Sequence, residues 1–423
     1  MQFAGLSLIP LLCGRNLAYI SRSPLDLAHR SGAHEATRRP NTVAFLKTSA
    51  GSLTNESAKP IGIGIVGTGV IFDAYARGLG LDPRVEILRV ADLDTLRARE
   101  AAARWGIPKS GTAEELLADG DISVVVNITP PAAHSSLTRA ALNAGKHVYV
   151  EKPLALTRED AQGDIELATA RGLKLGCAPD TYLGQAGQTA RYAVDAGLIG
   201  EVFAASSFII SSRTETWHPN PAAFFAPGGG PALDLGPYHL AHLINLLGPV
   251  RGVLGASRTV RSRLPVSSAG RTADFIDVSI PTHTSAVLCF DSAIATAMYS
   301  FEIWDAELPH LEIYGTEGTL MLPKANRFDE PVRIIRRNEE VTVLEPVISR
   351  TTPEPAWPYR ALGVLDLVES LSGGTHKTSA DRAFHILDVL DTVSTLDEHE
   401  GYRPIFSTCS RPEPVSAAPR VSA

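Results

Sequence analysis

The chain alternates short apolar runs with amphipathic stretches between about residues 59 and 178. The apolar runs predict buried strands over 61–66, 85–91, 122–128 and 147–150. The intervening stretches predict helices over 70–81, 95–105, 132–144 and 157–171, and Thr112 and Glu115 have the spacing of a capping box for another helix. Strands that alternate with helices in this way form a parallel, doubly wound sheet with right-handed crossovers.

After about residue 178 the pattern changes, and strands cluster between helices. It predicts helices over 183–196, 232–247, 359–371 and 381–395, and strands over 202–211, 285–290, 293–301, 311–314, 319–322 and 332–335. Such an arrangement is typical of an α+β domain with a large open, mostly antiparallel sheet. We therefore expect an α/β domain over 59–178, an α+β domain over 179–406, and a frayed tail over 407–423.

Residues 1–58 differ from the rest, with an apolar start followed by a stretch rich in Arg, Ser, Ala and Thr. The first basic residue, Arg15, follows the apolar run, whereas a secretory signal carries its positive charge before that run. Two kinds of interpretation remain for this extension. In the first, the segment is disordered, or the start of the sequence was assigned too early. In the second, it is an organelle or export targeting segment.

Composition excludes several classes of function. The net charge of −7 argues against a nucleic-acid partner, which requires a concentrated basic surface. No apolar run reaches the roughly 18 residues that a membrane helix needs, so no membrane span is predicted. The four cysteines are widely separated and form neither a CxxC pair nor a disulfide framework. This indicates a reducing compartment and a cytoplasmic protein, unless residues 1–58 direct it elsewhere.

A glycine turn follows the first predicted strand and reads Gly67-Thr68-Gly69-Val70-Ile71-Phe72. Two glycines at this spacing let the backbone turn tightly and let a pyrophosphate approach the N-terminus of the next helix. The third position of the fingerprint is Phe72 rather than Gly or Ala, and so short a motif alone is more often an ordinary turn. The context favours a dinucleotide site, because Asp92 ends the second strand, where a carboxylate accepts hydrogen bonds from the adenosine ribose.

Asp92 also bears on the choice of cofactor. A carboxylate at this position repels a 2′-phosphate, which favours NAD over NADP. Arg97 and Arg99, in the following helix, could weaken that preference, so NADP stays open as an alternative.

Lys152 is the leading candidate for a catalytic residue. It lies in Glu151-Lys152-Pro153, directly after the last predicted strand, and open α/β sheets bind ligands beyond the carboxyl ends of their strands. An ammonium group there would stabilise charge on the oxygen of a carbinol or carbonyl group and relay its proton. A solvated surface lysine is the alternative.

The chain resembles the Gfo/Idh/MocA family, named for glucose–fructose oxidoreductase, inositol dehydrogenase and a rhizopine-catabolism enzyme. The resemblance rests on the glycine turn, on Thr129-Pro130-Pro131 with His134, and above all on Glu151-Lys152-Pro153. Further matches lie in 197–201, 228–236 and 314–320, and the resemblance covers about residues 60–405. The glycine turn is unspecific, whereas the ordered set with the Glu-Lys-Pro element is quite specific.

The resemblance implies a Rossmann domain followed by an open-faced sheet domain, with the active site between them. It implies that Lys152 hydrogen-bonds the reacting oxygen and that Asp234 matches a family aspartate, although a helix N-cap is the alternative for Asp234. The family's histidine, four residues further on, is replaced by Tyr238, with His239 beside it. Both residues are therefore candidates for the proton transfer.

The remaining candidates surround these groups. We expect cofactor contacts from Gly67, Thr68, Gly69, Val70, Ile71, Asp92, Thr129, Pro130, His134, Glu151 and Lys152. Substrate contacts are expected from Asp180, Trp217 and Trp304, for which a turn or helix cap and core packing are the alternatives. His239 and His242 have no third ligand in view, so no metal site is predicted.

Together these features predict an NAD(P)-dependent oxidoreductase that transfers a hydride between nicotinamide and a carbinol or carbonyl carbon of a sugar, cyclitol or related polyol. Two rivals remain. One is glycosidase-type oxidation and elimination without net redox change, and the other is a non-catalytic dinucleotide-binding regulatory protein. The uncovered face of the second sheet predicts a homodimer or homotetramer.

Overall fold

The computed structural model describes residues 59–211, 214–218, 221–348, 360–396 and 401–415. The expectations for residues 1–58, for Tyr359 at the start of a predicted helix, and for residues 416–423 lie outside these ranges.

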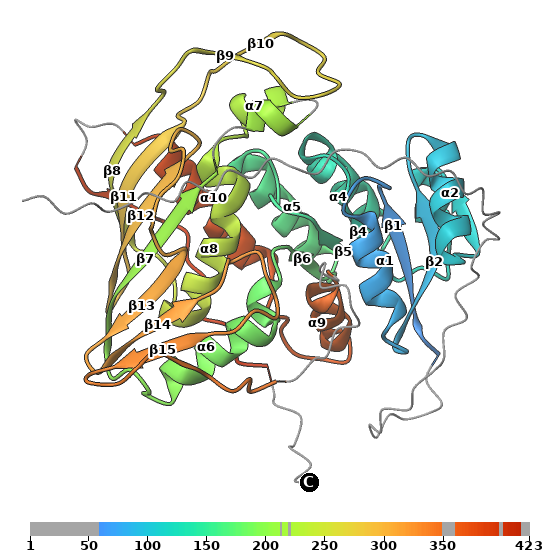
Figure 1. Ribbon diagram of the computed structural model, residues 1–423. Coiled ribbons are helices and arrows are strands. Elements are labelled where there is room, and N and C mark those ends of the chain that lie inside the picture. Colours follow the sequence, from blue (N-terminus) through green and yellow to red (C-terminus); the bar gives the residue numbers. More distant parts are fainter. Residues whose placement is uncertain (1–58, 212–213, 219–220, 349–359, 397–400, 416–423) are drawn as a thin grey trace, which may run out of the picture. The chain divides into compact units, whose positions relative to one another are not determined.

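Within the described residues, the first sheet has six strands, all parallel, in the order β3-β2-β1-β4-β5-β6 (Figure 1). The strands are β1 (Ile61–Val66), β2 (Val85–Ala91), β3 (Lys109–Gly111), β4 (Val124–Asn127), β5 (His147–Val150) and β6 (Leu175–Cys177). The order reverses at β1, because β2 and β4 pair with its opposite edges. This reversal is the switch point at which open α/β sheets bind ligands. The predicted doubly wound sheet is confirmed.

The sequence predicted the longer strands better than the short ones. β1, β2 and β5 have the expected bounds, and the strand expected over 122–128 is shortened to β4. β3 and β6 were not predicted, because three residues each are too few to show an apolar period.

Five helices connect these strands in the part of the chain that the structure describes: α1 (Phe72–Gly80), α2 (Thr95–Trp105), α3 (Ala113–Ala118), α4 (His134–Asn143) and α5 (Arg158–Ala170). Thr112 and Glu115 form the predicted capping box of α3, and Thr157 caps α5 by accepting a hydrogen bond from the backbone N–H of Asp160. α1 begins later than the expected residue 70, because the residues before Phe72 belong to the glycine turn.

A helix from the far end of the chain also covers this sheet. α9 (Leu362–Ser370) places Val364 and Leu367 in one buried cluster with Ile63, Tyr75 and Tyr149. The sequence predicted the helix but not its location. A segment that follows most of the second sheet in sequence therefore completes the core of the first.

The second sheet is large and mixed, as predicted. Within the described residues it has nine strands in the order β16-β15-β14-β13-β7-β12-β11-β8-β17. All neighbours pair antiparallel except β7 and β12, which pair parallel. The strands are β7 (Val202–Ile210), β8 (Gly252–Arg258), β11 (His283–Cys289), β12 (Ile294–Ser300), β13 (Leu311–Gly315), β14 (Gly318–Leu322), β15 (Arg333–Arg336), β16 (Thr342–Val343) and β17 (Arg403–Pro404). A separate hairpin joins β9 (Arg263–Pro265) to β10 (Phe275–Asp277).

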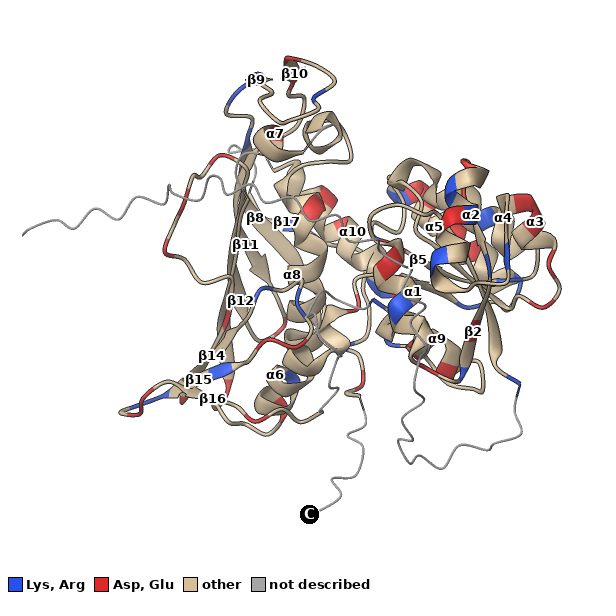
Figure 2. Cartoon of the chain, turned by 45° about the vertical axis from the view of Figure 1, so that its right-hand side comes forward, with Lys and Arg blue, Asp and Glu red and all other residues tan. Residues whose placement is uncertain are grey.

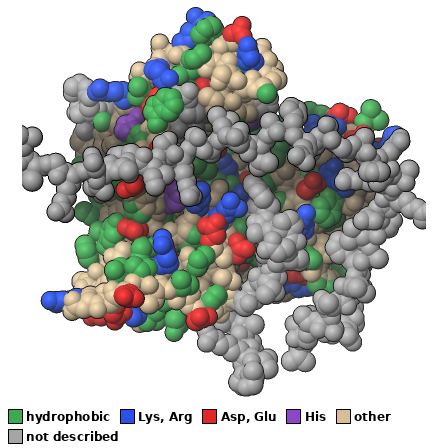
Figure 3. Space-filling model, viewed as in Figure 1, with side chains coloured by type: hydrophobic (Ala, Val, Ile, Leu, Met, Phe, Trp, Pro, Cys, Tyr) green, Lys and Arg blue, Asp and Glu red, His purple; other side chains and the backbone are tan. Residues whose placement is uncertain are grey.

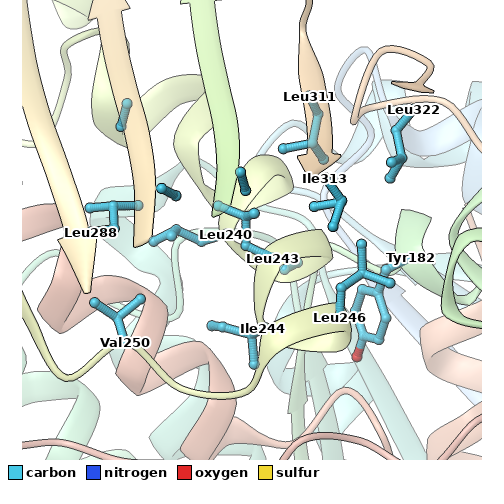
Figure 4. Close-up of a cluster of buried hydrophobic side chains, with 14 of the residues drawn as sticks. Tyr182, Leu240, Leu243, Ile244, Leu246, Val250, Leu288, Leu311, Ile313 and Leu322 are labelled. Atoms are coloured by element: carbon cyan, nitrogen blue, oxygen red, sulfur yellow. The ribbon is translucent and has the colours of Figure 1, made fainter. Parts of the chain in front are cut away.

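Helices cover one face of this sheet. α6 (Gln185–Asp195), α8 (Pro231–Leu247) and α10 (Ala380–Ser394) lie on the same side, which Figure 2 shows with the sheet nearly edge-on. In the core between them, Leu240 and Leu243 of α8 pack towards Leu311 and Ile313 of β13 (Figure 4). On the opposite face, large apolar side chains stay exposed, including Ile294, next to the buried Ala295 of β12, and Ile335, next to the buried Ile334 of β15.

The tail that we expected to fray is anchored over its described part. Asp388 of α10 accepts hydrogen bonds from the amide and hydroxyl of Ser407, and Arg191 of α6 donates one to the carbonyl of Pro412. Further along, the amide of Val415 donates to Gln188. Among the described helices, none is long and apolar enough to cross a membrane.

Candidate active site

The glycine turn has the backbone that a dinucleotide site requires. Gly67 adopts a φ of +107°, and a Cβ at this position would lie 2.8 Å from the carbonyl oxygen of Ile128. A Cβ at Gly69 would meet no atom within 4 Å, so the backbone there is open to an approaching ligand. Val70 is fully exposed and Ile71 precedes the first residue of α1. The turn thus presents the N-terminus of α1 to an anion.

Asp92 is tied directly to this turn. Its Oδ2 accepts hydrogen bonds from the amide of Thr68 at 2.8 Å and from the Thr68 hydroxyl at 2.6 Å. Burial raises the pKa of Asp92, but hydrogen bonds from Thr68 and from the amide of Asp94 outweigh it, so the pKa is lowered and the carboxylate stays charged. Arg97 donates to the Thr68 carbonyl at 3.1 Å, so a cation lies on the same turn.

Lys152 extends from the end of β5 to the start of α8. Its Nζ donates to the backbone carbonyl of Asp234 at 2.6 Å and lies 3.3 Å from the carboxylate Oδ1 of the same residue. Burial lowers the pKa of Lys152, but Tyr238, Asp234 and Glu151 raise it, and the net result is a raised pKa. The group is therefore an ammonium ion at neutral pH. Asp234 lies within the first turn of α8 and does not cap it, so its carboxylate is placed beside the Lys152 ammonium.

Tyr238 lies between two cations. Arg360 donates a hydrogen bond to its hydroxyl at 2.8 Å, and the guanidinium carbon lies 5.1 Å from the ring centroid. Lys152 Nζ is 5.5 Å from the same centroid. Burial raises the pKa of Tyr238, and the charges of Arg360 and Lys152 oppose that rise. Because a guanidinium only donates, the tyrosine keeps its own proton for another acceptor.

A cavity of about 240 Å³ brings the predicted groups together. It is lined by Ile71, Ile128, Thr129, His134, Glu151, Lys152, Tyr238 and Arg360. Ile71, Thr129 and His134 come from the expected cofactor loops, whereas Lys152 and Tyr238 are expected catalytic residues. The cavity is therefore bounded on one side by the parallel sheet and on the other by α8.

Three expected cofactor residues shape the loops around this cavity. The ring of His134 bridges two loops, with Nδ1 2.6 Å from the Pro153 carbonyl and Nε2 2.9 Å from the Thr129 carbonyl. Burial lowers the pKa of His134. Glu151 accepts a hydrogen bond from the Tyr75 hydroxyl at 2.9 Å. Pro130, also expected here, precedes a single turn of 3-10 helix at Pro131–Ala133.

His239 faces a second cavity, of about 230 Å³. Tyr238 lines both cavities, whereas His239 lines only this one of the two. The Nδ1 of His239 lies 3.0 Å from the Ser207 hydroxyl. Burial, followed by the charges of His242 and His310, lowers the pKa of His239 to about 3, so its ring is neutral. Of the two candidates for proton transfer, Tyr238 is the one beside Lys152.

The three expected substrate residues lie outside both cavities. Asp180 is fully buried and accepts a hydrogen bond from the amide of Gly363 at 2.9 Å. Burial raises the pKa of Asp180 to about 6, although Arg360 opposes the rise. Trp217, in the short helix α7 (Thr214–Trp217), is 61% exposed and Trp304 is 74% exposed, so neither belongs to the core. Their predicted contacts with substrate have no support in this geometry.

No group of three or more His, Cys, Asp or Glu side chains could hold a metal ion in the part of the chain that the structure describes. A dinucleotide, by contrast, fits the residues present. The open backbone at Gly69, the exposed N-terminus of α1 and the charged carboxylate of Asp92 are the groups that a pyrophosphate and a ribose need.

Comparison with known proteins agrees with this geometry. A sequence model described as the oxidoreductase family with an NAD-binding Rossmann fold matches residues 61–178, and the model of the family's C-terminal domain matches residues 188–321. The chain belongs to the Gfo/Idh/MocA family. It is an NAD(P)-dependent oxidoreductase of that family, with an NAD-binding Rossmann domain.

Curated relatives in the family include sugar-modifying enzymes. A dTDP-3,4-didehydro-2,6-dideoxy-alpha-D-glucose 3-reductase of Streptomyces violaceoruber is 31% identical over 278 residues, which are 64% of this chain and 75% of that protein. A 1,5-anhydro-D-fructose reductase of Ensifer adhaerens is 33% identical over 177 residues, 41% of this chain and 52% of the relative. The solved structure of a levoglucosan dehydrogenase with NADH and L-sorbose has a TM-score of 0.69 at 20% identity, covering 82% of this chain and 99% of that one.

Arg360 is the site residue that sequence reasoning missed. This Gfo/Idh/MocA member carries it after β16 and just before α9, far in sequence from Tyr238. It belongs to none of the motifs that carry the family resemblance, so no signal in the sequence pointed to it.

Proposed function

We propose that this protein is a dehydrogenase or reductase that acts on a CH–OH or C=O group of a sugar, cyclitol or related polyol, with NAD as cofactor and NADP as the alternative. One observation carries the proposal. The ammonium of Lys152 and the hydroxyl of Tyr238 line the same cavity as the loops that a nicotinamide cofactor would contact. The names of the sugar-acting relatives support the substrate class.

The chain's own residues provide the cofactor site. The turn from Gly67 to Gly69 would hold the pyrophosphate at the N-terminus of α1, and Asp92 would bind the adenosine ribose. When bound, the nicotinamide supplies the carbon that accepts or donates the hydride.

Tyr238 and Lys152 divide the proton chemistry between them. In reduction, the Tyr238 hydroxyl gives its proton to the substrate oxygen. In oxidation, Tyr238 first loses that proton to solvent, and the resulting tyrosinate takes up the proton of the substrate hydroxyl. Lys152 stabilises negative charge on the substrate oxygen, because its ammonium is already aligned by Asp234. Arg360 stabilises the tyrosinate through its hydrogen bond. The Nδ1 of His239 lies within hydrogen-bonding distance of the Ser207 hydroxyl, and its ring is neutral. Its role in this proposal is to orient the substrate rather than to transfer the proton.

Replacement of Lys152 by Met tests the proposal. We expect turnover of a sugar and cyclitol panel, followed at the nicotinamide absorbance band, to fall by about 10²–10³ because one stabilising donor is lost. The dissociation constant of NADH, measured by fluorescence, should change little. The matched control is Lys146→Met, since Lys146 is also buried and donates to backbone carbonyls, but away from the site.

Each outcome decides between the interpretations. Turnover of Lys152→Met within tenfold of the unmodified protein, or no binding of either nucleotide by the unmodified protein, would overturn the proposal. Product formation without net change in nicotinamide absorbance would favour the redox-neutral rival. Nucleotide binding with no turnover of the whole panel would favour the regulatory rival.

The exposed apolar face of the second sheet supports a homodimer or homotetramer. Ile294 is 56% exposed and Ile335 is 37% exposed on the face opposite the helices. Uncovered apolar surface of this kind usually marks an interface. A monomeric mass by light scattering would refute this assembly.

A further inference from the structure

The second cavity carries a positive charge and no described carboxylate. Its described lining is Phe208, Ile209, Ile210 and Ser211 from the end of β7, Leu235, Tyr238 and His239 from α8, His310, and Lys324, Ala325 and Asn326. Asp and Glu are absent from this lining. Figure 3 draws one face of the molecule and shows lysine or arginine side chains beside a histidine near the middle of that face.

Lys324 is exposed at the cavity, and its side chain forms no hydrogen bond or ion pair with any residue that the structure describes. The other cations near the site are occupied. Lys152 is paired with Asp234, and Arg360 donates to Tyr238 and lies 3.9 Å from Glu151. Lys324 is therefore the cation of this site whose charge is left for a ligand.

His310 lies beside this lysine and is affected by its charge. Burial lowers the pKa of His310, Lys324 lowers it further, and Glu330 acts in the opposite direction. Glu330 is itself paired with Arg327 at 3.5 Å, so it does not neutralise Lys324. His310 offers a neutral ring that becomes a second cation when an anion binds beside it.

A neutral polyol would call for a different lining. Its hydroxyl groups donate hydrogen bonds, and carboxylates are the strongest acceptors for them. An ammonium without a partner instead selects a carboxylate or phosphate oxygen. The cavity is small enough for a single sugar-sized group, because drug-sized ligands occupy about 300–1,000 Å³.

We propose that the substrate carries an anionic group, a carboxylate or a phosphate, which Lys324 binds with the help of His310. The reacting carbon then lies at the other end of the molecule, where Tyr238 joins this cavity to the one that holds Lys152. This inference rests on the proposed function and adds the charge of the substrate to it.

Matched pairs of probes test the preference without turnover. D-gluconate and D-glucitol differ by a carboxylate in place of a CH₂OH group, and D-glucose 6-phosphate and D-glucose differ by a phosphate. Binding of each to the NADH-saturated protein is measured by calorimetry at low salt. We expect at least one anion to bind about tenfold more tightly than its neutral partner, since one charge-assisted hydrogen bond at an exposed site is gained. The pair that shows the difference identifies carboxylate or phosphate.

Variants assign the preference to its residue. Lys324→Gln should abolish the difference within a pair, and Lys324→Glu should reverse it. The control, Lys59→Gln, removes an exposed lysine of the first domain and should leave the difference unchanged. Neutral probes that bind as tightly as the anions, no binding of either anion at millimolar concentration, or an unchanged difference in Lys324→Gln would overturn the inference.

The proposed function fails separately. It depends on NADH binding and on the loss of turnover in Lys152→Met, neither of which requires an anionic probe. Turnover of neutral sugars with no anion preference would remove only the charge assignment.

Discussion

Replacement of Arg360 by Gln tests how the proton-transfer residue is tuned. In the structure, Arg360 is buried and donates to the Tyr238 hydroxyl at 2.8 Å. Glutamine removes the positive charge, and its shorter side chain ends two bonds before the position of the donating Nη2. If Tyr238 accepts the substrate proton, the charge of Arg360 stabilises the tyrosinate that forms.

The magnitude follows from that single charged hydrogen bond. Such bonds contribute about 1.5–3 kcal/mol, and one pKa unit corresponds to about 1.4 kcal/mol. Loss of the charge should therefore raise the pKa of Tyr238 by about one to two units. Oxidation near neutral pH should slow by about tenfold to a hundredfold, because less of the tyrosinate is available, and the acid limb of the kcat/KM profile should move to higher pH.

The chain offers a matched control. Arg382 donates to the hydroxyl of Tyr182 at 3.0 Å, and its guanidinium lies 5.8 Å from that ring, in a buried pair away from the cavities around Tyr238. Arg382→Gln removes the same charge from a similar contact. Both variants are compared by thermal melting, by NADH affinity and by the pH profile of oxidation.

The reasoning is refuted if Arg360→Gln slows oxidation no more than Arg382→Gln does. It is also refuted if the limb of the pH profile stays in place, since a merely structural role would lower the amount of folded protein without moving a pKa.

Two further predictions concern the turn and the buried histidines. Gly67→Ala should destabilise the fold by about 1–2 kcal/mol through its left-handed backbone and weaken NADH binding by about tenfold or more through its contact with Ile128. Gly106→Ala, which also has a positive φ but meets no atom within 4 Å, should carry the backbone cost alone, and equal NADH affinity in the two variants would contradict the argument. Burial lowers the pKa values of His242 and His385 to about 4, so both are neutral when folded, whereas the unfolded chain takes up protons near pH 6.5. Stability is therefore full above pH 6.5 and falls by about 2 kcal/mol per histidine between pH 7 and pH 5, a share that His242→Gln should lose in denaturant melts.

The sequence predicted those parts of the molecule that depend on local pattern. β1, β2 and β5 are long apolar runs, and their bounds were read correctly. The family resemblance named Lys152 and Asp234 as separate candidates, whereas their ion pair was found only in the structure.

What could not be predicted depends on long-range packing. β8 contains glycine and polar residues at partly exposed positions, so its apolar period is weak, and its pairing with β11 defines it instead. Arg360 reaches Tyr238 only because α9 packs on the parallel sheet. Asp180, which was expected to contact substrate, is instead fully buried, and its Oδ2 accepts a hydrogen bond from the amide of Gly363.

Tyr238 and His239 show a limit of spacing arguments. Adjacent residues on a helix point about 100° apart, so only one of them can face a given group. The sequence placed both residues on the correct turn of α8, but it did not show which side of that helix faces Lys152. The packing of α8 against the second sheet directs His239 to Ser207 and leaves Tyr238 beside Lys152.

The contribution of α9 to the first sheet makes the nucleotide-binding half dependent on chain that is synthesised after most of the second sheet. Until residues 360–371 emerge, Tyr149 and its apolar neighbours lack their cover, and the guanidinium that contacts Tyr238 is absent. A fragment ending near residue 178 would therefore expose apolar surface, aggregate readily and fold poorly by itself. Both halves of this protein should melt in one cooperative transition, and truncation from the C-terminal side should remove cofactor binding before it reaches any residue that touches the cofactor.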